Sequence, residues 1–186
     1  MNYEKLVNQL VKQKIIKPED ADIYIYGLKY ALLYLINIII SAFLALLFHG
    51  MIYYIVILLL IIPLRRFAGG FHFNNSFVCF IFSQLCVFLP QIIIPYISGY
   101  THELILIFTI SFILLFFTTS KKKSISSKKR YTDEILIQKY TRKTLQIELL
   151  YLLLFILCIF MHFDSFAFII LYIVIVQLLS LIIPER

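Results

Sequence analysis

The sequence predicts an all-α polytopic membrane protein with about six transmembrane helices and an N-terminal amphipathic surface helix. Of its 186 residues 62% are hydrophobic, whereas a typical soluble domain is about 45 to 50% apolar. No residue from Tyr30 to Leu64 carries a full charge, and a membrane-spanning helix needs only about 20 residues of this kind. A soluble fold of this length has no room to bury so much apolar surface.

The first seventeen residues predict the amphipathic helix. Their apolar residues fall on one helical face and their lysines lie elsewhere. Such a helix either lies on the membrane surface, where the lysines meet anionic lipid, or docks on the body of the protein, and both interpretations stay open. Residues 1–26 contain no apolar stretch of the kind that a cleaved signal peptide needs. The residues of the apolar face are Leu6, Val7, Leu10 and Val11.

Six apolar stretches predict the spans of a single membrane domain, residues 1–186. The second is short, because the 14 residues from 51 to 64 rise only about 21 Å as a helix, against a hydrocarbon core of about 30 Å. It crosses by extending past Arg65, by thinning the bilayer, or not at all if 30–64 is a hairpin. The expected spans are 27–48, 51–64, 76–97, 103–118, 146–161 and 166–183. The domain then consists of an N-terminal helix and linker at 1–26, four spans at 27–118 that include the segment 65–79, a basic loop at 119–145, and two spans at 146–186.

The basic residues predict the orientation of the chain. If the spans alternate, all 17 lysine and arginine residues fall on one side of the membrane, and the opposite connections have none. The positive-inside rule therefore places both termini, the segment 65–79 and the basic loop in the cytoplasm. An odd number of spans would spoil this sorting.

The basic loop carries six positive charges between Lys121 and Arg130 and no acidic residue in that stretch. It serves either as a topology determinant beside anionic lipid or as a holder of an acidic peptide, and both interpretations stay open. Its sequence matches no nucleic-acid-binding fold, so no nucleic acid is expected as a partner.

The polar segment 65–79, RRFAGGFHFNNSFVC, interrupts the apolar sequence and holds a candidate catalytic pair. Of the four histidines only His72 is expected on the cytoplasmic side, and Cys79 follows it by seven residues. A continuous helix would separate the two by about 10.5 Å along its axis, but proton transfer needs a distance of roughly 3 Å. A working pair therefore requires a break in the helix between them.

The residues between the pair favour such a break, because glycine adopts conformations that other residues avoid and asparagine and serine are good N-caps. A helix that starts near Asn75 or Ser76 puts Cys79 in its first turn, where free N–H groups and the helix dipole favour a thiolate. His72 would then take the thiol proton and return it to a leaving amine, and the same N–H groups would stabilise an oxyanion. The residues with this structural role are Gly69, Gly70, Asn74, Asn75 and Ser76.

Simpler interpretations of these residues stay open. Cys79 is also explained as a small apolar filler, which is the simplest account of Cys86 and Cys158. Arg65 and Arg66 either close the second span at the membrane interface, or one of them binds a substrate carboxylate. No second cysteine or histidine stands at metal-ligand spacing around the histidine of the pair, so neither a metal nor a cofactor is expected.

In its layout and in this segment the chain resembles the accessory gene regulator B (AgrB) peptidases of Gram-positive bacteria. The specific part of the resemblance is short, and the lysines at 121 to 123 give it weaker support. Phe73 departs from the family, since many relatives have a small residue after the histidine, and no aspartate or asparagine that orients the histidine is evident. The residues that carry the resemblance are Arg65, Gly69, Gly70, His72 and Cys79.

The resemblance implies a cysteine endopeptidase, without a cofactor, in the cell membrane of a Gram-positive bacterium, with a small AgrD-like precursor peptide as substrate. Cys79 would attack the peptide bond before the acidic tail of the precursor and form a thioester, with His72 as base and then acid. An internal cysteine or serine of the precursor would next close a cyclic thiolactone or lactone, a quorum-sensing signal. The expected docking residues for the tail are Arg65, Arg66, Lys121, Lys122 and Lys123.

Two other functions stay open. A small transporter or permease subunit fits the number of spans. Transport usually places polar or charged groups at mid-membrane, however, and the expected spans offer few such residues. A non-catalytic membrane partner would make Cys79 incidental. Membrane lipids are expected around the chain, and a homodimer, which could even supply His72 and Cys79 from different chains, stays open as well. The noted mid-membrane polar residues are Asn37, Gln84, Ser111 and Gln177.

Overall fold

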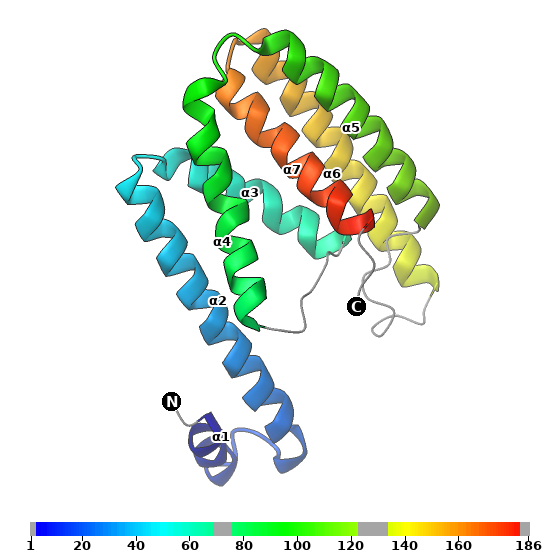
Figure 1. Ribbon diagram of the computed structural model, residues 1–186. Helices are drawn as coiled ribbons and strands as arrows, with labels where there is room; N and C mark the ends of the chain where they lie inside the picture. Colours follow the sequence, from blue (N-terminus) through cyan, green and yellow to red (C-terminus); the bar gives the residue numbers. More distant parts are fainter. Residues whose placement is uncertain (1–2, 69–75, 123–133, 183–186) are drawn as a thin grey trace. The chain divides into compact units, whose positions relative to one another are not determined.

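The computed structural model describes residues 3–68, 76–122 and 134–182 (Figure 1). Over these ranges the chain forms seven α-helices, two short 3-10 helices and no strand. This confirms the predicted all-α class. The chain divides into two compact units, Met1–Phe43 and Leu44–Arg186. The predicted division into a single membrane domain with its four parts stays a prediction.

The first unit contains α1 (Tyr3–Lys12), η1 (Pro18–Asp20) and most of α2 (Ala21–Leu47). On the apolar face of α1, Val7 is buried, whereas Leu6 is 44% exposed. One residue of the apolar face is therefore buried within the protein and another is exposed on its surface. Docking on the protein and contact with the membrane both stay open for this helix. Proline at the start of η1 fits its position, because the missing N–H would have no helical partner there.

The second unit is built around its last helix, α7. This helix contacts α3, α4, α5 and α6 (Figure 1). Three consecutive residues, Ile169, Ile170 and Leu171, are buried. Consecutive residues on a helix point in different directions, so α7 is covered on several sides and forms the centre of the core. The helices of this unit are α3 (Met51–Ala68), α4 (Ser76–Ile93), η2 (Ile94–Tyr96), α5 (Thr101–Lys122), α6 (Glu134–Phe160) and α7 (Asp164–Ile182).

Five described segments are long and apolar enough to cross a membrane. Large apolar side chains remain exposed on them, among them Leu59 (67%), Ile113 (61%) and Leu153 (65%), as suits helices whose outer surface meets hydrocarbon. The chain is therefore a multi-pass membrane protein. The five segments are Pro18–Leu47, Met51–Ala68, Thr101–Lys121, Ile137–Phe160 and Asp164–Ile182, and the remaining expected span contains the shorter apolar helix Phe80–Tyr96.

Several helix boundaries differ from those expected, among them those of the second and fifth spans. The second span does not stop before the arginines: α3 continues to Ala68, and its 18 residues rise about 27 Å, so the helix gains length by extending past Arg65. The helix of the fifth span, α6, is described from Glu134, twelve residues before the expected start at 146. The expected start marked where the sequence becomes apolar, but lysine, arginine and glutamine are good helix formers and continue the helix beyond that point.

Two of the connections between helices contain a histidine whose backbone is left-handed. His49 has φ of +52° and His162 has φ of +58°. After each, a backbone N–H reaches back five residues, from Gly50 to the carbonyl of Ala45 at 2.9 Å and from Phe163 to that of Cys158 at 2.8 Å. This is the Schellman arrangement, which satisfies carbonyls at a helix end. It closes α2 before α3 and α6 before α7.

Prolines inside α3 and α4 are accompanied by additional hydrogen bonds. Pro63 has no N–H for the carbonyl of Leu59, and the hydroxyl of Tyr151 on α6 donates to the next carbonyl, that of Leu60. In α4 the side-chain amide of Gln91, next to Pro90, donates to the carbonyl of Val87 at 3.2 Å. Side chains thus bond to the backbone near prolines, as proline-containing membrane helices require.

Candidate functional site

Cys79 lies at the start of α4. The structure describes this helix from Ser76, so Cys79 is its fourth described residue, and the start of the helix near Asn75 or Ser76 stays a prediction. The N–H groups of a first turn have no intrahelical partner and favour a nearby negative charge. The predicted approach of His72 to Cys79 stays a prediction, since His72 lies outside the described residues. Gly69, Gly70, Asn74, Asn75 and Lys123 lie outside them as well.

Cys86 lies on the face of α4 that is turned toward α7. It follows Cys79 by seven residues, a distance of about 10.5 Å along the helix axis. Cys86 is buried, its thiol is hydrogen-bonded to the hydroxyl of Tyr172 on α7, and the positive charge of Arg65 acts on it. Arg65 therefore lies near Cys86. Cys86 is buried as expected of an apolar filler, but it has a polar partner that the sequence did not suggest.

The end of α3 meets the first half of α6 around the ring of Phe67. The guanidinium carbon of Arg66 lies 5.8 Å from the centre of this ring, and the ammonium nitrogen of Lys143 lies 4.9 Å from it. The ring of Tyr140 packs against Phe67 with centroids 5.8 Å apart. Cations over aromatic faces are attracted by the ring quadrupole. Two basic side chains from distant parts of the sequence therefore converge here.

Lys143 was not predicted as a docking residue. In the sequence Lys143 is only one of many basic residues in a long stretch. Nothing in that stretch indicates that this lysine lies near the arginines at the end of α3. Such a contact depends on how α3 and α6 pack, and no spacing rule predicts it.

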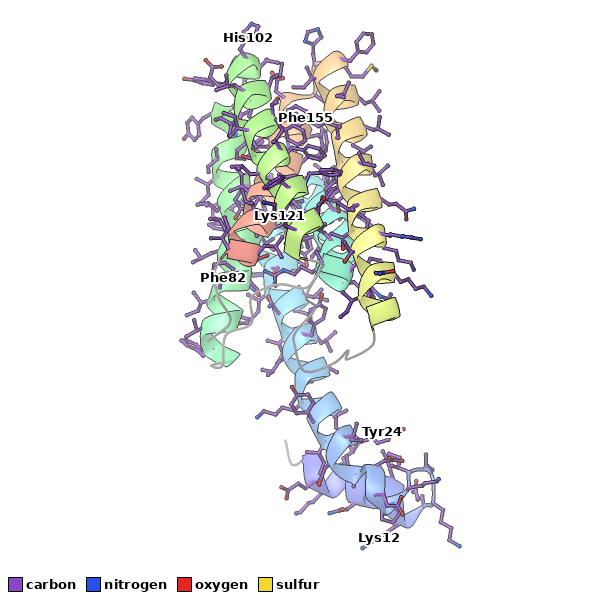
Figure 2. The ribbon with its side chains drawn as sticks, turned by 90° about the vertical axis from the view of Figure 1, so that its right-hand side faces the viewer. Lys12, Tyr24, Phe82, His102, Lys121 and Phe155 are labelled. Carbon is purple, nitrogen blue, oxygen red and sulfur yellow. The ribbon has the colours of Figure 1, made fainter. Side chains whose placement is uncertain are left out.

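Lys121 lies near the end of α5, with its ammonium nitrogen 4.2 Å from the centre of the Phe117 ring. Figure 2 shows His102 and Lys121 toward opposite ends of this helix. At the His102 end, the hydroxyl of Thr101 bonds to both carboxylate oxygens of Asp164 at 3.3 Å, which joins the starts of α5 and α7. Lys122 follows in the same helix. We call the other end of this unit the basic end; its basic side chains include Arg65, Arg66, Lys121 and Lys143.

A buried polar pair joins α5 to α6 near the basic end. The hydroxyl of Thr119 donates to Oε1 of Glu148 at 2.7 Å, and the two residues are 2% and 1% exposed. The neighbouring Thr144 is also buried, and its hydroxyl donates to the carbonyl of Tyr140 at 3.0 Å. The sequence interpretation missed Glu148, although it is an acidic residue inside the expected fifth span. The expectation that the polar residues of the spans are few and neutral was therefore wrong.

Within the described ranges, no group of three or more histidine, cysteine, aspartate or glutamate side chains is arranged to hold a metal ion.

These features define a multi-pass helical membrane protein with a cluster of positive charge at one end of its helices. The chain belongs to the accessory gene regulator B family, whose model matches residues 3–181. No curated protein and no solved structure matches the chain. Family membership supports a role in the accessory gene regulator system and places the chain among membrane proteins that resemble cysteine proteases.

Proposed function

We propose that the chain is a membrane-embedded cysteine endopeptidase that removes the acidic C-terminal tail of a small AgrD-like precursor peptide. The observation that supports this proposal is the position of Cys79 near the described start of α4 in a member of this family. The N–H groups of a first helical turn would stabilise a developing oxyanion, and Arg65 at the end of α3 would bind a carboxylate of the substrate.

The reaction starts with the thiol of Cys79. His72 takes the thiol proton, the sulfur attacks the carbonyl carbon of the peptide bond before the tail, and the C–N bond breaks as the proton passes to the leaving amine. A thioester between Cys79 and the remaining precursor results. An internal cysteine or serine of the precursor then attacks the thioester, regenerates the thiol and closes a thiolactone or lactone ring.

Ring closure must compete with hydrolysis of the thioester. A nucleophile tethered in the same peptide has a large effective concentration, and a site at the membrane holds little water. The product is a cyclic peptide of the kind used as a quorum-sensing signal, made on the cytoplasmic face of a Gram-positive cell membrane with both termini of the enzyme on that face.

The basic end is the proposed docking surface for the acidic tail. Arg65 lies near Cys86 on α4, and Arg66 and Lys143 share the ring of Phe67. Guanidinium groups bind carboxylates through two parallel hydrogen bonds, whereas lysines add a less directional attraction. Lys121 adds positive charge near the end of α5, and Lys122 and Lys123, which follow it in the sequence, are the other proposed docking residues.

Co-expression with a candidate precursor tests the proposal. The candidate has an amphipathic start, an internal cysteine and an acidic tail, and mass analysis reports the cleaved tail and the cyclic product. Cys79→Ala, Cys79→Ser and His72→Ala should abolish both products at unchanged membrane levels. Cys158→Ala is the matched control, because this half-buried cysteine lies far along the chain from the site, and it should retain both products. Cleavage that persists in Cys79→Ala would rule out the proposed nucleophile.

A further inference from the structure

Two rows of exposed residues lie beside the contact between α3 and α6. The two helices run in opposite directions: Leu60 on α3 meets Tyr151 on α6, and further along α3 the ring of Phe67 meets that of Tyr140, which is earlier on α6. Residues seven apart share nearly one face of a helix, and both rows have this spacing. All six residues of the rows are exposed. The row on α3 is Ile52, Leu59 and Arg66, and the row on α6 is Lys143, Leu150 and Leu157.

The two rows lie on the same side of this helix pair. On α3, Leu59 directly precedes Leu60, and on α6, Leu150 directly precedes Tyr151. Each row is therefore turned from the line of contact by one residue, about 100° around its helix, and in antiparallel helices equal turns lead to the same side. Glu148 is two residues from Leu150, nearly opposite it on α6, and is bonded to α5. The row on α6 thus faces away from α5.

The rows combine an apolar length with two positive charges at one end. Arg66 and Lys143 close the rows at the basic end, and both contact the ring of Phe67. The leucines next in each row lie about 10.5 Å from these cations along the helix axes, and the last residues about 21 Å from them. One leaflet of the hydrocarbon core is about 15 Å thick. The apolar part of the rows therefore covers the depth of an acyl chain, with the cations at the level of the lipid phosphate.

The two cations need a negative charge from outside the helix pair. Their described contacts are with an aromatic ring, and α3 contains no acidic residue. In α6, Glu134 lies nine residues before Lys143, about 13.5 Å along the axis, and Glu148 is bonded on the α5 side. Basic side chains at this level attract anionic lipids. The headgroup of phosphatidylglycerol is negative, whereas that of phosphatidylcholine carries a positive charge of its own.

We propose that the two rows form a binding site for one anionic phospholipid, with its phosphate between Arg66 and Lys143 and an acyl chain along the apolar residues. We call the six residues of the rows the lipid site. The inference goes beyond the proposed function and does not need it. The acidic tail of the proposed substrate meets the same two cations, so the lipid is the ligand that the tail displaces, and this last point alone rests on the proposed function.

The absence of tryptophan from the chain makes a direct test possible. Leu150→Trp and Leu59→Trp each place a single fluorescent reporter in one row of the full chain. The reporters are measured in vesicles that mix phosphatidylglycerol and phosphatidylcholine, with bromine at mid-chain of one lipid or the other, because bromine quenches a tryptophan that it contacts. Both reporters should favour phosphatidylglycerol by about fivefold or more, the scale of one charge near an anionic membrane surface.

Three sets of variants serve as tests and controls. In either reporter chain, Arg66→Gln and Lys143→Gln should each lower the preference by about fivefold. Lys139→Gln removes the same charge from an exposed position outside the rows and should leave the preference unchanged. Leu106→Trp carries the reporter to an exposed residue of α5 toward the end opposite the cations and should show no preference.

The outcomes decide the lipid site separately from the proposed function. Equal quenching by the two brominated lipids at both row reporters would overturn it and leave the two cations to the acidic tail of the precursor. A preference that survives both glutamine substitutions, that falls equally in Lys139→Gln, or that is as strong in Leu106→Trp would also overturn it, because general positive charge would then be the cause. None of these measurements involves cleavage, so their failure leaves Cys79 as the proposed nucleophile, and cleavage by Cys79→Ala would leave the lipid site intact.

Discussion

The ammonium nitrogen of Lys143 lies 4.9 Å from the centre of the Phe67 ring, which joins the first half of α6 to the last turn of α3. The same ring receives Arg66 at 5.8 Å. An aromatic face thus holds two positive charges that would otherwise repel each other in the absence of a ligand. This arrangement keeps the charges close together and available to an anionic peptide.

Replacement of Lys143 should weaken the binding of the precursor. Lys143→Gln removes one exposed charge from the basic end, so KM should rise about threefold at low salt, the scale of an exposed ion pair, and less at high salt because of screening. Lys139→Gln, an exposed lysine one turn earlier on α6, is the control and should change KM less. Equal effects of the two substitutions would mean that net charge, and not the position beside Phe67, determines binding.

The hydroxyl of Tyr151 should contribute to stability through its bond to the backbone of α3. Tyr151→Phe leaves the carbonyl of Leu60 without this donor and should lower the free energy of unfolding by about 1 kcal/mol. A thermal midpoint measured in detergent reports the change. Tyr96→Phe, at a residue that is 75% exposed, should leave the midpoint unchanged. An equal fall of the midpoint in Tyr96→Phe would mean that the hydrogen bond of Tyr151 does not contribute to stability.

Glycine should stabilise the turn between α6 and α7. His162 has φ of +58°, where a side chain costs about 1 kcal/mol or more and glycine costs little. His162→Gly should therefore raise the thermal midpoint. His102→Gly replaces a histidine within α5 and should lower it, because glycine is unfavourable in a helix. A lower midpoint in His162→Gly would mean that the imidazole makes a contact worth more than the backbone gain.

The stacked rings of Phe108 and Phe155 should be a major source of stability. Phe155 is 3% exposed, and Phe155→Ala should cost about 3 to 5 kcal/mol, as buried phenylalanine truncations do. Phe160→Ala, on the same helix but 78% exposed, should cost little. Denaturation in increasing detergent or urea compares the two, and similar losses would contradict the central role of the stack.

The fold class and most spans follow from the sequence because apolar length is a local property. The sequence does not predict that the charged side chains lie close together. Arg66 and Lys143 are separated in the sequence by α4, η2 and α5, and their contact with the same Phe67 ring depends on helix packing. The start of α6 at Glu134 was also missed, since a polar helix extending from the membrane has no apolar signal.

The candidate catalytic pair stays a prediction. The expected first-turn position of Cys79 rests on N-cap residues before it, which is a local pattern. The polar partner of Cys86 could not be predicted, because Tyr172 lies on α7, far along the chain. Glu148 could have been predicted as a buried polar residue, because it is an acidic residue in an apolar stretch. Its partner Thr119 could not, because their hydrogen bond depends on how α5 packs on α6.

The burial of α7 on several sides has a consequence for biosynthesis. In the order of translation, α7 follows every helix that it contacts, α3, α4, α5 and α6. These earlier helices enter the bilayer before the segment that forms their common centre exists. During that interval their inner faces meet lipid or one another, which makes the nascent chain a natural substrate for membrane chaperones and quality-control proteases until the final helix inserts.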